Sequence, residues 1–108
     1  EDVKKNRGVA SLYDLIEAKK FNHKAVSAGE WRRAKIVSNN GNVEHWLDNE
    51  KVLEYNRFSQ VFRALVEYSK YSKWENFAQQ KSGHILLQDH GDEVSFKNIK
   101  IREFNNEK

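Results

Sequence analysis

The stretch that decides the fold is residues 31–55, "WRRAKIVSNNGNVEHWLDNEKVLEY". Its first part alternates polar and apolar residues, which is the period of a half-buried β-strand. Asn40-Gly41 follows, and an Asn-Gly pair between two alternating runs is the strongest short signal of a β-hairpin, because both residues tolerate positive φ. A second tight turn over residues 48–50 leads into the run "KVLEY". The stretch therefore predicts a three-strand antiparallel meander.

The alternation also sorts the side chains of this sheet onto two faces. One face is predicted to carry Trp31, Arg33 and Lys35 from the first strand and Glu44 and Trp46 from the second. Neighbouring strands bring such side chains together on one surface. An indole can stack on a sugar ring while a carboxylate binds hydroxyls or moves a proton, so this patch predicts a functional groove. The alternative is a surface glutamate beside a tryptophan packed under a loop.

The opposite face of the second strand carries His45 between Val43 and Leu47. Buried polar groups in proteins are usually hydrogen-bonded. We therefore expect His45 to be a packed, hydrogen-bonded histidine and not a ligand.

The segments before and after this meander carry weaker signals. Residues 9–17, "VASLYDLIE", predict a strand, and residues 18–30 predict a polar loop that exposes His23. After the meander, apolar residues recur at helical spacing. They predict a helix over about residues 59–71 with Ser59 as a possible N-cap. Residues 72–82 then predict a loop that is anchored by its tryptophan and phenylalanine.

The strand signal returns in the last part of the chain. Residues 84–89 predict a strand, Gly91 a turn, and residues 93–104 a further strand. The apolar parity changes within this last run, which predicts a β-bulge near Lys97 and Asn98. A mostly β chain with one inserted helix indicates a β-sandwich.

The segment "HILLQDHGDE", residues 84–93, is open to more than one interpretation. Asp89 and His90, with Asp92 or Glu93, could hold a metal, but no recognised spacing such as His-Glu-x-x-His is present. The alternative is a polar hairpin turn whose glycine takes positive φ. The sequence alone leaves both open.

Side-chain parity separates the residues of this segment further. Ile85 and Leu87 are expected to face the core of a sandwich. His84, Gln88 and His90 share the other parity, so they are expected to face the groove.

Composition limits the classes of function. The chain has 108 residues, of which 38% are hydrophobic, 32% charged and 12% aromatic, as in one globular domain or part of one. A net charge of +3 with scattered cations argues against nucleic-acid binding. No cysteine is present, so no disulfide framework is possible. No run approaches the roughly 20 apolar residues of a membrane span, and the first residues do not resemble a signal peptide.

Residues 29–55 and 65–103 resemble the 3-keto-disaccharide hydrolase domain family. The typical family pattern runs Gly-Glu-Trp-Asn, Val-Glu-His-Trp-Leu-Asn-Gly and Lys-Val-Val-Glu-Tyr, then Gly-His-Ile-x-Leu-Gln-Asp-His-Gly and Phe-Arg-Asn-Ile-Lys-Ile. The upstream "GVASLYDLIEA" is similar to the family's Gly-x-x-Tyr strand. The resemblance covers nearly the whole chain in the same order.

The resemblance implies an all-β fold, a concanavalin-like jelly-roll β-sandwich of antiparallel sheets with one inserted helix at about residues 59–71. Residues 1–108 are then a single partial domain, the C-terminal portion of the sandwich. We expect another fragment or a partner subunit to supply the N-terminal strands, because open sheet edges need cover. The resemblance also implies an extracellular or periplasmic protein.

The activity that the resemblance implies is cleavage, by hydrolysis or elimination, of glycosides oxidised to a ketone at carbon three. The ketone acidifies the proton on carbon two, which a histidine can abstract near neutral pH. A cation or donor must stabilise the enolate oxygen. The residues expected in these roles are His90, Asp89 and Glu44 for catalysis, and Trp46, Gln88, Lys35 and Arg33 for substrate binding.

No metal site is predicted, although a divalent metal remains possible. Two other classes stay open, a non-catalytic carbohydrate-binding module and a structural sandwich of a larger exported protein. No nucleic-acid partner is expected.

Three positions depart from the family pattern. Arg32 replaces the asparagine after the tryptophan, and Lys97 replaces an arginine. Asn49 stands in place of the glycine in the family's Leu-Asn-Gly-x-Lys turn, so we expect Asn49 to adopt positive φ.

Overall fold

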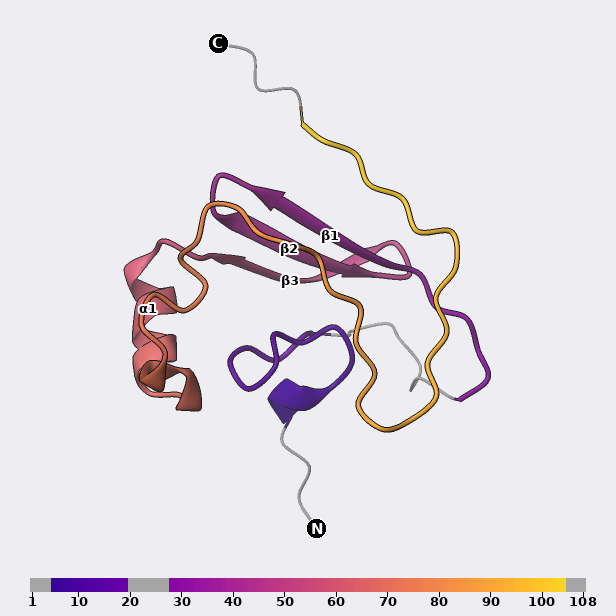
Figure 1. Ribbon diagram of the computed structural model, residues 1–108, viewed down its shortest axis with the longest axis horizontal. Coiled ribbons are helices and arrows are strands. Elements are labelled where there is room, and N and C mark those ends of the chain that lie inside the picture. Colours follow the sequence, from indigo (N-terminus) through magenta and orange to yellow (C-terminus); the bar gives the residue numbers. More distant parts are fainter. Residues whose placement is uncertain (1–4, 20–27, 105–108) are drawn as a thin grey trace.

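The computed structural model describes residues 5–19 and 28–104 (Figure 1). It contains a three-strand antiparallel sheet, one α-helix and two short 3₁₀ helices. The elements in chain order are η1 (Lys5–Arg7), β1 (Ala34–Asn39), β2 (Asn42–Leu47), β3 (Glu50–Asn56), α1 (Gln60–Glu67) and η2 (Lys70–Lys73).

The predicted meander is confirmed, with strand order β1-β2-β3. Asn40 and Gly41 join β1 to β2 with φ of 52° and 88°. Asp48 and Asn49 join β2 to β3 with φ of 51° and 71°, which confirms the expectation for Asn49. Two-residue turns with positive φ at both positions match the right-handed twist of the strands that they connect.

A register shift interrupts the pairing of β2 with β3. His45 pairs with Leu53, whereas Trp46 pairs with Lys51, so Val52 is the extra residue of a bulge. The bulge allows the consecutive residues Val52 and Leu53 both to be buried, at 3% and 8% exposure.

The core lies on one side of the sheet. Residues 5–16 and α1 lie on that side in Figure 1. Leu47 and Leu53 form a buried cluster with Ala18, and Leu12 and Ile16 pack against it. The core is small, since the described part of the chain buries few side chains completely.

The helix is shorter than predicted. Ser59 is the N-cap, as expected, and its Oγ accepts a hydrogen bond from the Phe62 amide at 3.1 Å. The helix ends at Glu67 and not near residue 71. Ser69 explains this end, because its Oγ bonds to the Val66 carbonyl and the Tyr71 amide and caps η2 instead. No helix in the described ranges is long and apolar enough to cross a membrane.

The loop over residues 72–82 is anchored as predicted. The rings of Phe77 and Tyr71 stack with centroids 4.2 Å apart, and Trp74 lies beside them. Arg57 donates to the carbonyls of Ala78 and Gln80 at 2.6 and 3.0 Å. These contacts tie the loop to the end of β3.

The strand predicted over residues 9–17 is wrong. This segment consists of turns with one isolated bridge between Leu12 and Ile16. Positive φ at Ala10 and Asp14 prevents a continuous extended backbone. Most of the loop predicted after it, with His23, lies outside the described residues.

The strands predicted over residues 84–89 and 93–104 are also wrong. Residues 79–104 form no regular element as far as they are described, and in Figure 1 they are drawn as an irregular trace that ends away from the sheet. A strand needs a partner for its backbone groups, and no described segment supplies one. Gly91 takes positive φ as expected, at 97°. Asn98 takes φ of 56° at the predicted bulge, but without a ladder the irregularity is a bend.

The expected core positions Ile85 and Leu87 are exposed, at 76% and 51%. The second sheet of the expected jelly roll is not formed by the described residues, because the segments predicted to build it remain unpaired. The jelly roll therefore stays a prediction. The structure shows a three-strand sheet with one α-helix.

Candidate functional site

The best-organised polar cluster lies on the face of the sheet opposite the core. Lys35 on β1 pairs directly with Trp46 on β2. The Lys35 Nζ lies 4.4 Å from the centroid of the Trp46 ring, a cation–π contact. The Trp46 Nε1 donates to the Glu44 Oε1 at 2.8 Å. The structure therefore brings together three of the seven predicted site residues.

This arrangement orients each group for binding. The indole N–H is used to hold the Glu44 carboxylate, and that carboxylate keeps Oε2 without a partner among the described residues. Lys35 is exposed and holds its ammonium over one face of the ring. An aromatic face, a carboxylate and a cation at this spacing can hold a polyhydroxylated ring and donate to a carbonyl oxygen.

Strand β3 extends the same face with two residues that sequence analysis missed. Lys51 pairs with Trp46, and Glu54 pairs with Glu44. The Lys51 Nζ lies 2.7 Å from the Glu54 Oε1, and the Asn42 amide donates to its Oε2 at 3.0 Å. These hydrogen bonds, the one from Lys51 above all, lower the pKa of Glu54, and the same ion pair raises the pKa of Lys51.

The bulge explains why this pair was missed. Under strict alternation Lys51 and Glu54 would point to opposite faces. The extra residue Val52 brings both to the face of Glu44 and Trp46. The signal that could have revealed the bulge is the adjacent pair Val52-Leu53, since two consecutive apolar residues break the alternation.

Arg33 and Arg32 contribute differently. The Arg33 backbone amide donates to the Asp48 Oδ1 at 3.0 Å, and its side chain is exposed just ahead of β1. Arg32 forms an ion pair with Asp48. The departure from the family pattern at Arg32 thus supports the turn between β2 and β3.

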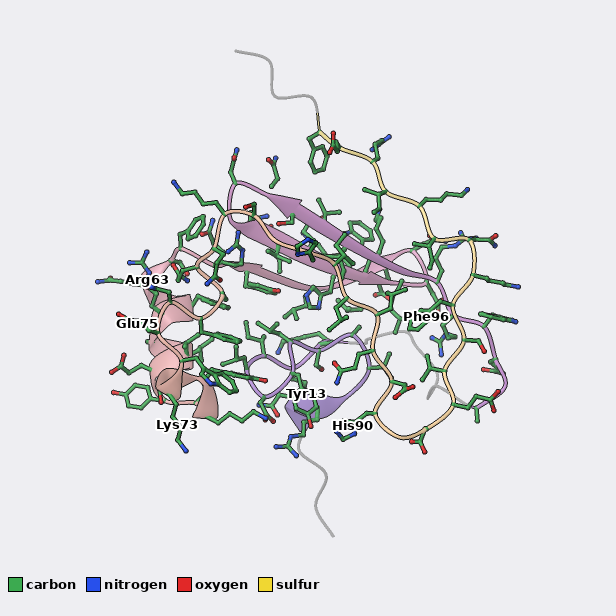
Figure 2. The ribbon with its side chains drawn as sticks, in the orientation of Figure 1. Tyr13, Arg63, Lys73, Glu75, His90 and Phe96 are labelled. Atoms are coloured by element: carbon green, nitrogen blue, oxygen red, sulfur yellow. The ribbon has the colours of Figure 1, made fainter. Side chains whose placement is uncertain are left out.

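The remaining predicted site residues are not brought to this face. Gln88, Asp89 and His90 are exposed within residues 79–104, and the described structure assigns them no hydrogen bond or ion pair. Figure 2 shows His90 apart from the strands, at the side where Tyr13 lies. The convergence of Gln88 and His90 with Glu44 and Trp46 therefore stays a prediction. In the described ranges, no three His, Asp or Glu side chains lie close enough to hold a metal ion.

His45 is a structural residue, as expected. Its Nδ1 lies 2.7 Å from the Ala10 carbonyl oxygen and its Nε2 lies 3.1 Å from the Tyr55 hydroxyl. Tyr55 in turn stacks on Phe62 with ring centroids 5.5 Å apart. Burial raises the pKa of Tyr55. His45 thus links residues 5–19 to the sheet and to the helix.

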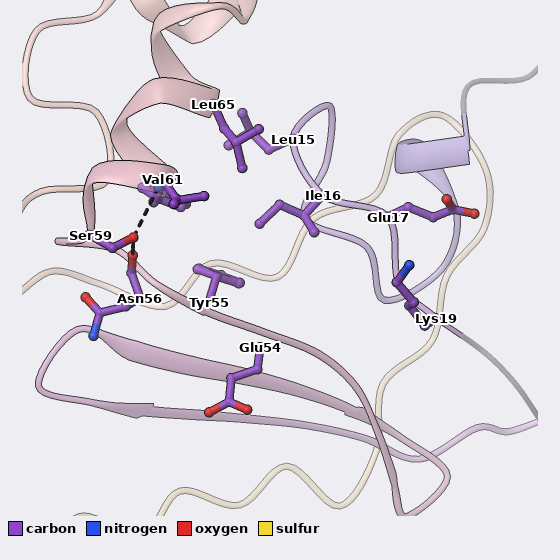
Figure 3. Close-up of a pocket in the computed structure, with 11 residues that line it drawn as sticks. Leu15, Ile16, Glu17, Lys19, Glu54, Tyr55, Asn56, Ser59, Val61 and Leu65 are labelled. Carbon is purple, nitrogen blue, oxygen red and sulfur yellow. Dashed lines mark hydrogen bonds between the residues drawn. The ribbon is translucent and has the colours of Figure 1, made fainter.

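A cavity of about 430 Å³ opens between residues 15–19, β3 and α1 (Figure 3). Its walls are mainly apolar, from Leu15, Ile16, Val61, Phe62 and Leu65. None of the predicted site residues lines it. The cavity is therefore separate from the predicted groove.

Comparison with known proteins gives three findings. A family profile described as "3-keto-alpha-glucoside-1,2-lyase-like domain" matches residues 1–102. A Bacteroides thetaiotaomicron protein named 3-keto-disaccharide hydrolase is 39% identical over 107 residues, covering 90% of this chain and 36% of that protein. A crystal structure of a putative glycosyl hydrolase from Parabacteroides distasonis superposes with a TM-score of 0.61 at 20% identity, covering 70% of this chain and 34% of that one.

The chain spans about a third of the length of these two relatives. The structural likeness shows a shared fold over the matched part. The profile match and the 39% identity together show the family. The chain belongs to the family of 3-keto-alpha-glucoside-1,2-lyase-like domains.

Proposed function

We propose that the protein is a glycoside-cleaving enzyme that acts on 3-keto-glycosides, and that the face formed by β1, β2 and β3 holds the sugar. The observation that carries this proposal is the contact set of Trp46, Glu44 and Lys35. The name of the Bacteroides relative, 3-keto-disaccharide hydrolase, supports the substrate class.

The chemistry divides between cation and base. Lys35 lies beside the indole and can donate to the ketone oxygen as negative charge develops there. His90 is the candidate base for the proton on carbon two, with Asp89 or Glu44 to orient it. As the enolate re-forms the ketone as an enone, the bond from carbon one to the glycosidic oxygen breaks, and protonated His90 is the candidate acid that gives its proton to the departing oxygen. Gln88 and Arg33 are candidates to bind the remaining oxygens. The reaction then requires residues 84–92 to approach the face that carries Trp46.

Replacement of His90 by alanine tests the catalytic role in the full-length protein. Turnover of a 3-keto-glucoside disaccharide should fall by about a hundred-fold or more, because general acid–base groups contribute factors of that size. Release of free sugar is the measurement. Lys81→Ala is the matched control, since Lys81 is exposed in the same segment and has no predicted role in the groove. Unchanged turnover in His90→Ala would remove His90 from the mechanism.

A second candidate function is non-catalytic carbohydrate binding. The observation in its favour is that the sugar-binding residues are ordered on the sheet while His90 lies apart from it (Figure 2). Under this alternative, both oxidised and unoxidised disaccharides quench the Trp fluorescence of the full-length protein on binding. Neither disaccharide is cleaved. Cleavage of the oxidised sugar decides for the enzyme.

We also propose that strands from another fragment or a partner subunit complete the sandwich, in an exported protein. The support is apolar surface on unpaired backbone, with Ile36 on the edge strand 71% exposed and Ile101 73% exposed. Mass measurement of the purified protein tests this proposal. A monomer of these 108 residues alone with a sharp melting transition would contradict it.

A further inference from the structure

The face opposite the core presents a second carboxylate beside Glu44. Glu54 on β3 pairs directly with Glu44 on β2 in the register of the sheet. Side chains at directly paired positions have Cβ atoms about 5 Å apart. The Glu54 side chain is 43% exposed, so a ligand on this face can reach it.

The orientation of Glu54 is visible from the other side of the sheet. In Figure 3 its carboxylate points away from Ile16 and Leu65, which line the cavity beside the helix. The carboxylate therefore lies on the face of Trp46, although Glu54 is also one of the residues that line the cavity.

Two neighbours hold the Glu54 carboxylate in place as an anion. Lys51 binds Oε1 at 2.7 Å and Asn42 binds Oε2 at 3.0 Å. These contacts lower the pKa of Glu54, so the group is a hydrogen-bond acceptor at neutral pH. Each oxygen has a further lone pair with which to accept from a ligand hydroxyl.

We infer that Glu54 is a further substrate-binding residue of this face, which accepts hydroxyl groups of the sugar that rests against Trp46. The inference rests on the proposed function of the face. Glu44 and Glu54 together present two carboxylate acceptors at directly paired positions on neighbouring strands. Neither carboxylate can bind the ketone oxygen, which is only an acceptor, so that oxygen is left to Lys35.

The different roles of Lys35 and of the two carboxylates predict how the sugar is selected. The oxidised carbon has lost a donor hydroxyl, and it must face the cation. The carbons that keep their hydroxyls must face the two carboxylates. Glu54 therefore contributes to binding of the polyhydroxyl part of the substrate and takes no part in bond cleavage.

The test compares Glu54→Gln with the wild type in the full-length protein, with a 3-keto-α-glucoside disaccharide as the probe. The variant should raise KM by about ten-fold, the scale of one charge-assisted hydrogen bond, and change kcat by about two-fold at most. Glu67→Gln is the matched control, because Glu67 is exposed on α1 and distant from this face in the fold. It should leave KM and kcat unchanged.

A structural role for Glu54 would lower the melting temperature without this split between KM and kcat. Where Glu54→Gln melts lower, Glu54→Asp decides, since it keeps the charge but withdraws the carboxylate by one methylene. A raised KM at unchanged kcat in Glu54→Asp supports the inference. An unchanged KM in Glu54→Asp overturns the inference. The proposed function still stands in that case, provided that the wild type cleaves the probe. A wild type that neither binds nor cleaves the probe overturns the proposed function and this inference with it.

Discussion

Residues 34–56 and residues 79–104 carry the same kind of sequence signal but differ in structure. Both contain runs in which apolar and polar residues alternate. The first region forms a paired sheet with a buried face, and the second forms no regular element and exposes its apolar side chains. The difference lies in the turns. In the first region, two-residue turns bring each strand back onto its neighbour, whereas Gly91 only bends the second region.

Alternation of polar and apolar residues therefore shows that a segment can pair as a β-strand. It does not show that a partner strand is present. A hairpin closes a very short loop, so the partner strand follows directly in the chain and the entropic cost of pairing is low. A strand whose partner is distant in sequence pairs only when that partner is present. Substitutions at matched positions of the two regions test this distinction.

The largest effect is expected for Leu47→Ala, which should destabilise the fold by about 2–5 kcal/mol, as buried leucines do when truncated. Leu47 is 2% exposed at the centre of the core cluster. Leu86→Ala is the matched change in the second region, where Leu86 is 82% exposed, and should alter stability by less than about 0.5 kcal/mol. Urea denaturation gives both values. Equal losses would show that the second region is packed.

Gly41→Ala is expected to cost about 2–4 kcal/mol, from positive-φ strain and a steric clash. Gly41 has φ of 88°, and an added Cβ would lie 2.4 Å from the Phe58 Cδ2. Gly91→Ala is the control, since Gly91 has φ of 97° but nothing within 4 Å of an added Cβ. Thermal melts of the two variants give the two losses of stability. Gly41→Ala combines backbone strain with a steric clash, whereas Gly91→Ala has backbone strain alone. A larger loss in Gly91→Ala would contradict the structural account.

A smaller, pH-dependent effect is expected for Asp14→Asn. The Asp14 side chain is 8% exposed and binds Arg7 and Lys70. The hydrogen bond from Arg7, with that from Lys70, lowers the pKa of Asp14 from 3.8 to about 2. Since the folded pKa is depressed, the stabilisation is complete above pH of about 4 and is lost as the pH falls through about 2.

The variant should therefore melt below the wild type at pH 7, and the two melting temperatures should converge near pH 2. Asp89→Asn is the control from the second region, because Asp89 is exposed with no partner in the described structure. It should leave the melting temperature at pH 7 unchanged. A gap for Asp14→Asn that is the same at pH 2 and pH 7 would sink this explanation.

Much of the sheet could be predicted because its determinants are local. The turn pairs Asn40-Gly41 and Asp48-Asn49 and the N-cap Ser59 follow from residues a few positions apart. The burial side of His45 follows from its shared parity with Val43 and Leu47, although its hydrogen-bond partner Ala10 is distant in sequence. The contact of Glu44 with Trp46 follows from their shared parity on β2. The end of the helix could not be predicted from the apolar spacing. The hydrogen bonds of Ser69 to neighbouring backbone groups end the helix, and the spacing of apolar residues does not depend on them.

Residues 31–55 were enough to predict the meander, its turns and the shared face of Glu44 and Trp46 on β2, because each depends on backbone preferences and on alternation between neighbouring strands. That Lys51 and Glu54 share the face of Trp46 became visible only in the folded chain, since one extra residue at Val52 inverts the alternation of β3. The tertiary structure also decided that residues 9–17 and 84–104 do not pair as strands. The physical reason is the same in both cases. The position of a side chain in a sheet depends on its partner strand, and that partner is a property of the assembled fold.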